Sequence, residues 1–166
     1  MQYLLRYLSH QQIDQAFPLV QLAEPGLSLE RWRAFAGCMA RDDPAGFAAG
    51  TPPERCVVTA QDTAKYIHGL FCYRLREDLL ADRTLKVSHF CVCSLVDPAG
   101  VTEALLRAID ILAGRLGCPQ VCAELSDGAS ALMGRRALIQ HFETFGHRAG
   151  GLFFRRRQAG QEAASS

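Results

Sequence analysis

The sequence predicts an α/β fold in which a mixed, mostly antiparallel sheet carries helices on both faces. Two observations predict this fold. Between residues 55 and 96, three segments with strand patterns follow one another across short connections, an order typical of an antiparallel meander. The third segment is followed by a helix pattern and another strand, and a strand–helix–strand order is typical of a parallel pair.

The N-terminal third predicts one strand and two helices. Gln2–Leu8 is a strand candidate, and Ser9 is expected to cap a helix that begins near His10. Pro18 lies inside that helical pattern, where it should kink the helix or mark its true start. A turn at residues 24–26 precedes a second helix, which Ser28 should cap. The apolar residues at helical spacing in that helix are Leu29, Trp32, Phe35, Ala36 and Met39. Of these, Trp32, Phe35 and Met39 either form a plain core face or line a substrate cleft.

The central third is expected to hold a loop and three strands. Residues 42–53 are rich in Gly, Pro and Ala, which is typical of a loop. The strands are Arg55–Ala60, Ala64–Leu75 and Thr84–Val96, with hairpin connections at 61–63 and 76–82. Because side chains alternate along a strand, we expect one face of the third strand to carry His89 together with Leu85, Val87, Cys91 and Cys93.

The C-terminal third alternates helices and strands. A turn at residues 97–100 leads into a helix from about Gly100 to Leu116, which should end at Gly117-Cys118-Pro119. The apolar side of this helix consists of Val101, Leu105, Ala108, Ile109 and Leu112. A strand over Gln120–Leu125, a helix over Ala129–Thr144 and a strand over Arg148–Arg156 follow. We therefore expect a single domain over residues 1–157 and a disordered tail over residues 158–166.

Composition narrows the classes of function. The 166 residues carry a net charge of +1, so bulk electrostatics gives no reason to expect nucleic acid as a partner. No apolar run reaches the roughly 18 residues of a membrane span. The N-terminal segment lacks the pattern of a signal peptide, so we expect a cytoplasmic protein without a membrane partner.

Seven cysteines without an export signal predict free thiols rather than disulfides. Cys91 and Cys93 lie on one side of a strand, and Cys72 and Cys122 lie on candidate neighbouring strands, so these four thiols could converge on zinc. The sequence lacks the CxxC turns that usually hold structural zinc. Buried packing of the thiols is therefore favoured, and no metal is expected.

Three local motifs accompany this order of elements. Phe17-Pro18-Leu19-Val20 precedes a helix that opens as Leu-Ser-x-x-x-Trp. Gly100-Val101-Thr102-Glu103-Ala104-Leu105-Leu106 matches a Gly-x-Gly-x-x-Leu-Leu pattern, and Phe142-Glu143-Thr144-Phe145-Gly146-His147 matches a Tyr-Glu-x-Leu-Gly-Phe pattern. From Gln2 to about Arg157, the chain resembles the GNAT superfamily of acyl-CoA-dependent N-acetyltransferases.

The resemblance implies a GNAT-like fold and transfer of an acetyl group from acetyl-CoA to a primary amine of a small molecule or peptide. Strand backbone at Cys93, Ser94 and Leu95 would then hold the pantetheine arm. The N–H groups of Gly100, Val101, Thr102 and Glu103 would hold the pyrophosphate of coenzyme A, because a helix N-terminus attracts anions. Dimers are common in such families, so a homodimer is among the expected assemblies.

Three residues depart from the family pattern. Asp97 places a carboxylate where the family's pyrophosphate loop carries Arg or Gln, and Thr102 replaces a small residue. We expect Asp97-Pro98 to cap the helix one turn early, so that Asp97 occupies part of the anion site. Phe142 stands where many members carry a tyrosine that protonates the leaving thiolate, and a phenyl ring has no proton to donate. These departures favour an alternative, a catalytically silent GNAT-like module that binds a ligand or a partner protein.

Two residues are candidates for the catalytic base. His89 lies on the central strand, and histidine changes protonation near neutral pH, so it could take a proton from the amine. Glu124 stands near the end of the strand that follows the cofactor helix. Each has a structural alternative, which is a hydrogen-bonded core histidine for His89 and a solvated or ion-paired carboxylate for Glu124. His68, on the preceding strand, is open to the same two interpretations as His89.

Overall fold

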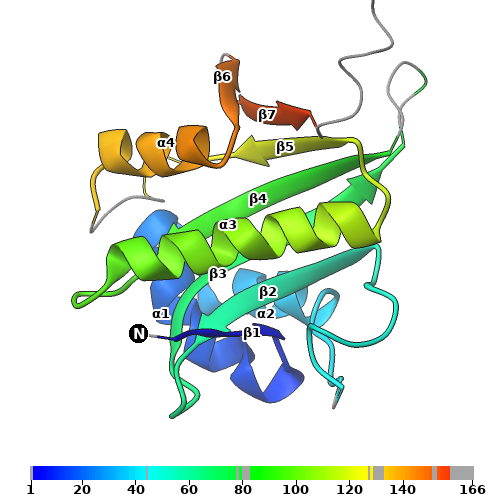
Figure 1. The fold of residues 1–166 in the computed structure, drawn as a ribbon. Helices are drawn as coiled ribbons and strands as arrows, with labels where there is room; N and C mark the ends of the chain where they lie inside the picture. The colour runs from blue at the N-terminus through cyan, green and yellow to red at the C-terminus, as the bar shows by residue number, and fades with distance from the viewer. Residues whose placement is uncertain are drawn as a thin grey trace, which may run out of the picture.

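The chain folds around one central sheet (Figure 1). The computed structural model describes residues 2–43, 45–77, 79, 83–126, 128, 133–150 and 153–157. The expected tail over 158–166 therefore lies outside the described residues, as do residues 129–132 of the expected fourth helix. The elements are β1 (Leu4–Tyr7), the 3₁₀ turn η1 (His10–Gln12), α1 (Ile13–Ala23), α2 (Leu29–Gly37), β2 (Arg55–Gln61), β3 (Ile67–Arg76), β4 (Thr84–Val92), α3 (Pro98–Arg115), β5 (Gln120–Glu124), α4 (Arg135–Thr144), β6 (Arg148–Gly150) and β7 (Phe153–Arg157).

The strands form one mixed sheet in the order β1-β2-β3-β4-β5-β7-β6. β4 and β5 pair in parallel, with α3 as the crossover between them, and the other neighbouring strands pair antiparallel. The predicted α/β class with a mostly antiparallel sheet is confirmed. No helix in the described part of the chain is long and apolar enough to cross a membrane.

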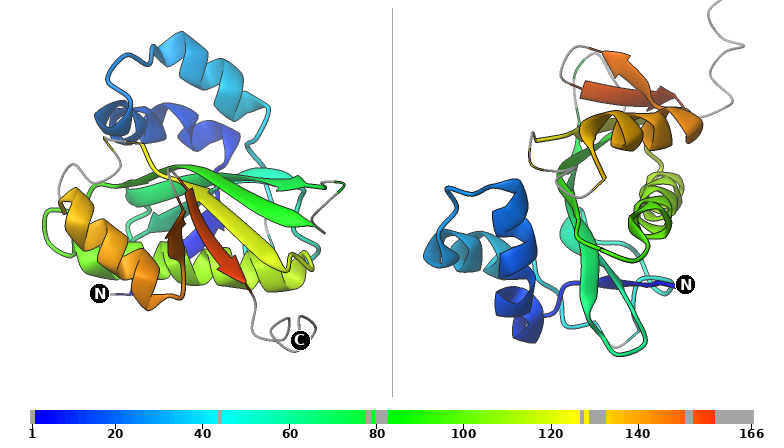
Figure 2. Two further views of the ribbon diagram at one scale, coloured as in Figure 1. Left: turned by 90° about the horizontal axis from the view of Figure 1, so that it is seen from above. Right: turned by 90° about the vertical axis from the view of Figure 1, so that its left-hand side faces the viewer.

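Helices cover both faces of the sheet, as the right-hand view of Figure 2 shows. α3 and α4 lie over one face, and all five apolar residues predicted for the core side of α3 are fully buried there. α1 and α2 lie over the other face, where Trp32 is buried and its indole N–H donates to the carbonyl oxygen of Ile13 at 2.7 Å. This bond ties the two N-terminal helices together above β3 and β4.

Several predicted boundaries in the N-terminal helices need correction. The side chain of Ser9 forms no capping hydrogen bond, and η1 precedes α1 instead. The α-helix starts at Ile13 and continues through Pro18, so the proline neither begins nor ends it. The predicted cap of α2 is confirmed, because Ser28 Oγ accepts the N–H of Arg31 at 3.3 Å.

The C-terminal half differs from the predictions in three places. β4 ends at Val92 rather than Val96, and α3 begins at Pro98 rather than Gly100. The fourth helix begins at Arg135, after Gly134 with a φ of 85°. The single predicted final strand is two antiparallel strands, with β7 against β5 and β6 at the edge. Gly150, where β6 ends, is of a residue type that commonly marks such a reversal.

A β-bulge in β4 overturns the predicted phase of its side chains. Leu70 pairs with Cys91 and Cys72 with Ser88, so Phe71 alone faces both His89 and Phe90. His89 takes the left-handed φ of 51° that accommodates the extra residue. Leu85, Val87, Phe90 and Val92 belong to the core beneath α3, whereas Cys91 belongs to the core beneath α1 and α2. The expectation that His89 shares a face with Leu85 and Val87 is therefore wrong.

Candidate functional site

The parallel strands β4 and β5 separate partway along the sheet. Their pairing covers Thr84–Val87 of β4 and Gln120–Ala123 of β5, and no pairing between them continues beyond these residues in the described chain. From Ser88 to Val92, the edge of β4 that faces β5 is therefore available to another backbone or to a ligand. The bulge at His89 falls within this open edge.

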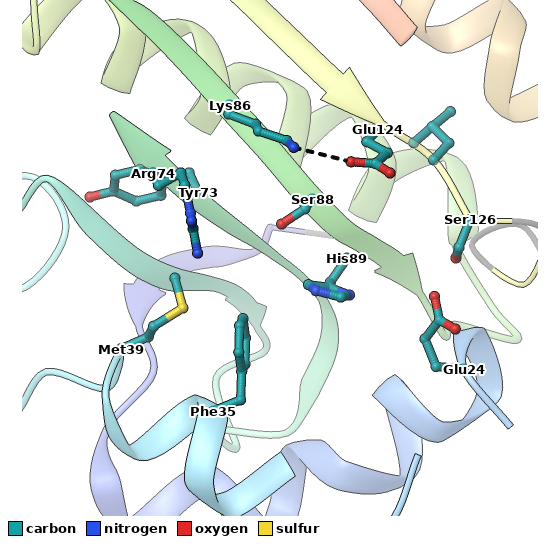
Figure 3. Close-up of a pocket in the computed structure, with 11 residues that line it drawn as sticks. Glu24, Phe35, Met39, Tyr73, Arg74, Lys86, Ser88, His89, Glu124 and Ser126 are labelled. Atoms are coloured by element: carbon teal, nitrogen blue, oxygen red, sulfur yellow. Dashed lines mark ion pairs between the residues drawn. The ribbon is translucent and has the colours of Figure 1, made fainter. Parts of the chain in front are cut away.

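A polar cavity of about 350 Å³ lies where the two strands separate. Figure 3 shows side chains from five parts of the fold around it. The charged and titratable ones are Glu24 from the end of α1, Arg74 from β3, Lys86 and His89 from β4 and Glu124 from β5. Phe35 of α2 and Met39, which follows α2, supply an apolar wall. The structure thus brings together both predicted base candidates, His89 and Glu124, in one cavity.

His89 occupies the centre of this site. Its ring is half-buried and meets the ring of Phe35 edge-on, with 5.3 Å between ring centroids. It also borders a second cavity of about 610 Å³ under Leu27 and Trp32. A left-handed φ costs a histidine about 1 kcal/mol, and strain of this kind often marks functional sites. The bulge aims the imidazole into the cavity rather than into the core beneath α3.

Glu124 forms an ion pair, which was the expected alternative to a role as catalytic base. Its carboxylate lies 3.5 Å from Lys86 Nζ, and both side chains remain partly exposed. Tyr73, which also lines the cavity, donates its hydroxyl to the carbonyl oxygen of Pro53 at 2.9 Å. Burial raises the pKa of Tyr73, so its hydroxyl stays neutral and does not compete with His89 as a base.

Ser126 contributes a hydroxyl that sequence reasoning missed. It follows β5 and lines the cavity, and its Oγ is buried without a hydrogen-bond partner among the described residues. Two residues further along the chain, a Cβ added at Gly128 would overlap the backbone of Ala23, so Gly128 lies tightly against the end of α1. This close approach brings Glu24 and Ser126 to the same end of the cavity (Figure 3).

The N-terminus of α3 is closed by its own cap. Asp97 Oδ1 accepts the N–H of Gly100 at 3.0 Å, and the carbonyl oxygen of Asp97 accepts the N–H of Val101 at 3.2 Å. Tyr3 donates its hydroxyl to Asp97 Oδ2 at 3.3 Å, and the N–H of Asp97 donates to Ser94 Oγ at 3.1 Å. The predicted early cap is confirmed.

Gly100 accommodates this cap rather than an external anion. A Cβ built on Gly100 would overlap the carboxylate of Asp97, so only glycine leaves room for it. Pro98 has no N–H to offer, which removes a further donor from the first turn. The positive end of the α3 dipole is therefore already matched by a fixed negative charge.

The residues expected to hold a pantetheine arm lie just beyond β4. The N–H of Cys93 donates to the carbonyl oxygen of His68 at 2.7 Å, which commits it to β3. Ser94 is buried, and Leu95 is 88% exposed. Ser88–Val92 provide the open strand edge instead. Strand pairing therefore assigns no role to Cys93, Ser94 or Leu95.

The expected pyrophosphate and thiolate residues are largely buried. Val101 and Thr102 are fully buried, and Thr102 Oγ donates to the carbonyl oxygen of Pro98 at 2.8 Å. Glu103 lies 4.0 Å from Arg107 on the helix surface. Phe142 is fully buried, with its ring edge-on to those of Phe90 and His147. Their contact with a cofactor stays a prediction.

The structure also shows where two further groups from the sequence analysis lie, namely His68 and the cysteines. His68 Nε2 and Asp62 Oδ2 share a hydrogen bond of 2.9 Å outside the cavity, so the structural interpretation of His68 accounts for its position. Cys56, Cys72, Cys91 and Cys118 are buried free thiols. Within the described residues, no cluster of three or more His, Cys, Asp or Glu side chains is arranged to hold a metal ion.

The fold of this chain recurs in proteins of known structure. No protein-family model matches the sequence, and no curated protein matches it. Solved structures match along nearly the whole chain. A GNAT-family acetyltransferase from Streptococcus pneumoniae has a TM-score of 0.64 at 10% identity, over 95% of this chain and 100% of its own. The chain has the GNAT fold.

Two other structures with this GNAT fold widen the comparison. A chimera of the spermidine N-acetyltransferase SpeG from Vibrio cholerae and hSSAT has a TM-score of 0.67 at 12% identity, over 95% of this chain and 96% of its own. A chain of the NatC complex bound to Gag peptide and CoA has a TM-score of 0.64 at 14% identity, over 96% and 100%. At these identities the likeness shows the fold.

The GNAT fold raises the question of whether coenzyme A fits this chain. The open edge of β4 offers backbone partners to an extended thioester arm. The N-terminus of α3 does not fit the diphosphate, because the Asp97 carboxylate takes the N–H of Gly100 and fills the space beside it. A diphosphate placed there would meet a like charge rather than free N–H groups.

Proposed function

We propose that the protein is an N-acyltransferase that transfers an acetyl group from acetyl-CoA to a primary amine of a small molecule or peptide. The observation that carries the proposal is the meeting of the open β4 edge with a polar cavity centred on His89. The GNAT fold of structures described as acetyltransferases supports it. The amine would lie in the cavity, on the side of the sheet covered by α1 and α2.

His89 is the proposed base. An amine must lose its proton before it can act as a nucleophile, and the half-buried imidazole in the cavity can accept that proton. The carboxylate of Glu24 can attract the ammonium form of the amine into the site. Glu124 is a less direct candidate for the base, because its charge is already paired with Lys86.

The open edge of β4 is proposed to position the acyl group. A bound acyl thioester supplies an activated carbonyl. Backbone N–H groups on the β5-facing edge of β4, between Ser88 and Val92, can orient that carbonyl and stabilise negative charge on its oxygen. Most of the rate gain would come from holding the carbonyl and the amine on either side of one strand edge. The diphosphate of the donor stays outside the N-terminus of α3.

A second candidate function has its own supporting observation. The resemblance assigns cofactor binding to the loop at Asp97 and protonation of the leaving thiolate to position 142. The Asp97 carboxylate caps α3 in place of an external anion, and the buried Phe142 has no proton to donate. These features favour a catalytically silent module that binds a small ligand in the same cavity.

Acetyl transfer to a panel of amines, followed by mass spectrometry, tests the first proposal against the second. We expect acetylated product with the wild type and a loss of about 10²–10⁴-fold in kcat with His89→Asn. His68→Asn is the matched control, because His68 is bonded to Asp62 outside the cavity, and it should keep full activity. Absence of product from every amine, together with no thermal stabilisation by millimolar acetyl-CoA, would support the silent module. A ligand present at 100 times its Kd should add about 2.7 kcal/mol.

A further inference from the structure

The cavity contains two charges that the described part of the chain leaves unpaired. Lys86 and Glu124 pair with each other at 3.5 Å. Arg74 and Glu24 line the same cavity, and neither forms an ion pair with another residue that the structure describes. Among the described residues, the exposed Arg74 and the half-buried Glu24 are therefore one cation and one anion that a ligand can pair with.

The two unpaired charges lie at different ends of the site. Figure 3 shows the guanidinium of Arg74 on one side of His89 and the carboxylate of Glu24 on the other, beside Ser126. Arg74 comes from β3 and Glu24 from the end of α1, so the sheet and the helix layer hold them apart. Phe35 adds apolar surface beside His89, and Met39 adds it near Arg74 (Figure 3). This arrangement complements a molecule with an anion at one end, a cation at the other and carbon between.

The chemistry of the two residues indicates which group each would bind. A guanidinium presents a planar fork of donors that matches the two oxygens of a carboxylate. The half-buried Glu24 gains from an ammonium partner, because an unpaired charge is costly away from water. His89 lies between the two charges, where it can take a proton from the amine (Figure 3).

The volume of the cavity is enough for a small ligand. A cavity of about 350 Å³ is at the small end of the roughly 300–1,000 Å³ typical of ligand pockets. We propose that the acceptor is a small zwitterion, an amino acid or short peptide, whose ammonium group lies at Glu24 and His89 and whose carboxylate lies at Arg74. The identity of this molecule as an acceptor rests on the proposed function, but its binding requires no acyl donor.

Isothermal titration of the protein without acyl donor tests the inference. The ligands are amino acids with increasing separation of their charges, from glycine to aminohexanoate, and two analogues that lack one charge each, pentylamine and hexanoate. We expect the best zwitterion to bind at least about tenfold more tightly than either analogue. Equal binding of pentylamine and every zwitterion would overturn the inference.

Two arginine variants on one strand sharpen the test. Arg74→Gln should weaken the best zwitterion about tenfold and leave pentylamine unchanged. Arg76→Gln is the matched control, because Arg76 is exposed on the same strand but does not line the cavity, and it should change neither affinity. If the two variants behave alike, Arg74 does not bind a carboxylate and the inference fails.

Acetyl transfer separates this inference from the proposed function. Transfer to plain amines and zwitterions with equal kcat/KM would overturn the zwitterion site and leave the transferase standing. Zwitterion binding that Arg74→Gln weakens, without transfer from any acyl donor, would support the site and remove the transferase.

Discussion

Replacement of Asp97 tests how the N-terminus of α3 receives an anion. The carboxylate accepts the N–H of Gly100 at 3.0 Å and the hydroxyl of Tyr3 at 3.3 Å, so it serves as cap and as fixed charge at once. Asparagine caps helices about as well as aspartate but carries no charge, whereas alanine supplies neither cap nor charge. Asp97→Asn and Asp97→Ala therefore separate the two roles.

The expected magnitudes follow from the two roles. Loss of the cap in Asp97→Ala should cost about 1 kcal/mol, which lowers the Tm by roughly 2–4 °C in a chain of this length. Asp97→Asn should stay within about 0.5 kcal/mol of the wild type. Two like charges about 5 Å apart repel by about 3 kcal/mol at an effective dielectric constant of about 20. Solvent and salt screen part of this repulsion, so we expect at least about a tenfold gain in diphosphate affinity when the charge is removed.

Titration with acetyl-CoA and with acetylpantetheine, which lacks the diphosphate, measures that gain. The wild type should bind the two with similar affinity, because its diphosphate site is filled. Both Asp97 variants should bind acetyl-CoA at least about tenfold more tightly than the wild type does, with acetylpantetheine unchanged. Asp97→Arg, which supplies a cation, should bind acetyl-CoA more tightly still. A wild type that already prefers acetyl-CoA tenfold, or variants that leave the ratio unchanged, would refute this account of the loop.

Three further predictions concern His89, the thiols and the loop after β2. His89→Asn should keep its free energy of unfolding within about 1 kcal/mol, since asparagine tolerates a left-handed φ, so unfolding in urea should separate its activity loss from misfolding. Burial raises the pKa of Cys56 to about 11, whereas Cys38 is exposed, so iodoacetamide should modify Cys38 in the native protein and Cys56 only after unfolding. The hydrogen bond to His68 lowers the pKa of Asp62, which adds stability above about pH 4 that is lost as acid protonates the carboxyl. Asp62→Asn should therefore destabilise the protein more at pH 7 than at pH 3, and an equal loss at both would contradict the sign.

The sequence predicted the architecture well because periodicity and caps are local signals. The apolar stripe of α3 is buried as expected, and Ser28 caps α2 as expected. Asp97-Pro98 caps α3 one turn before the pattern match at Gly100, and that too follows from the preferences of the two residues. These features depend on neighbours within a few positions in the chain.

The site was only partly predictable because a bulge has no strong local signature. Alternation placed His89 with Leu85 and Val87, but one extra residue in β4 moves it to the face beneath α1 and α2. The pairing of Lys86 with Glu124 and the position of Arg74 depend on which strands are neighbours. Such information appears only when the sheet order is known. His89 and Glu124 were identified by residue type, and the structure supplied the reason they lie in one cavity.

Acyl transfer at the open edge of β4 is the central proposal for this protein. A crystal structure with acetyl-CoA tests it directly. We predict that the thioester carbonyl lies against the backbone between Ser88 and Val92, with the acetyl group facing His89 across the cavity. Electron density for the cofactor elsewhere on the surface, or an edge that remains empty at saturating acetyl-CoA, would contradict the claim.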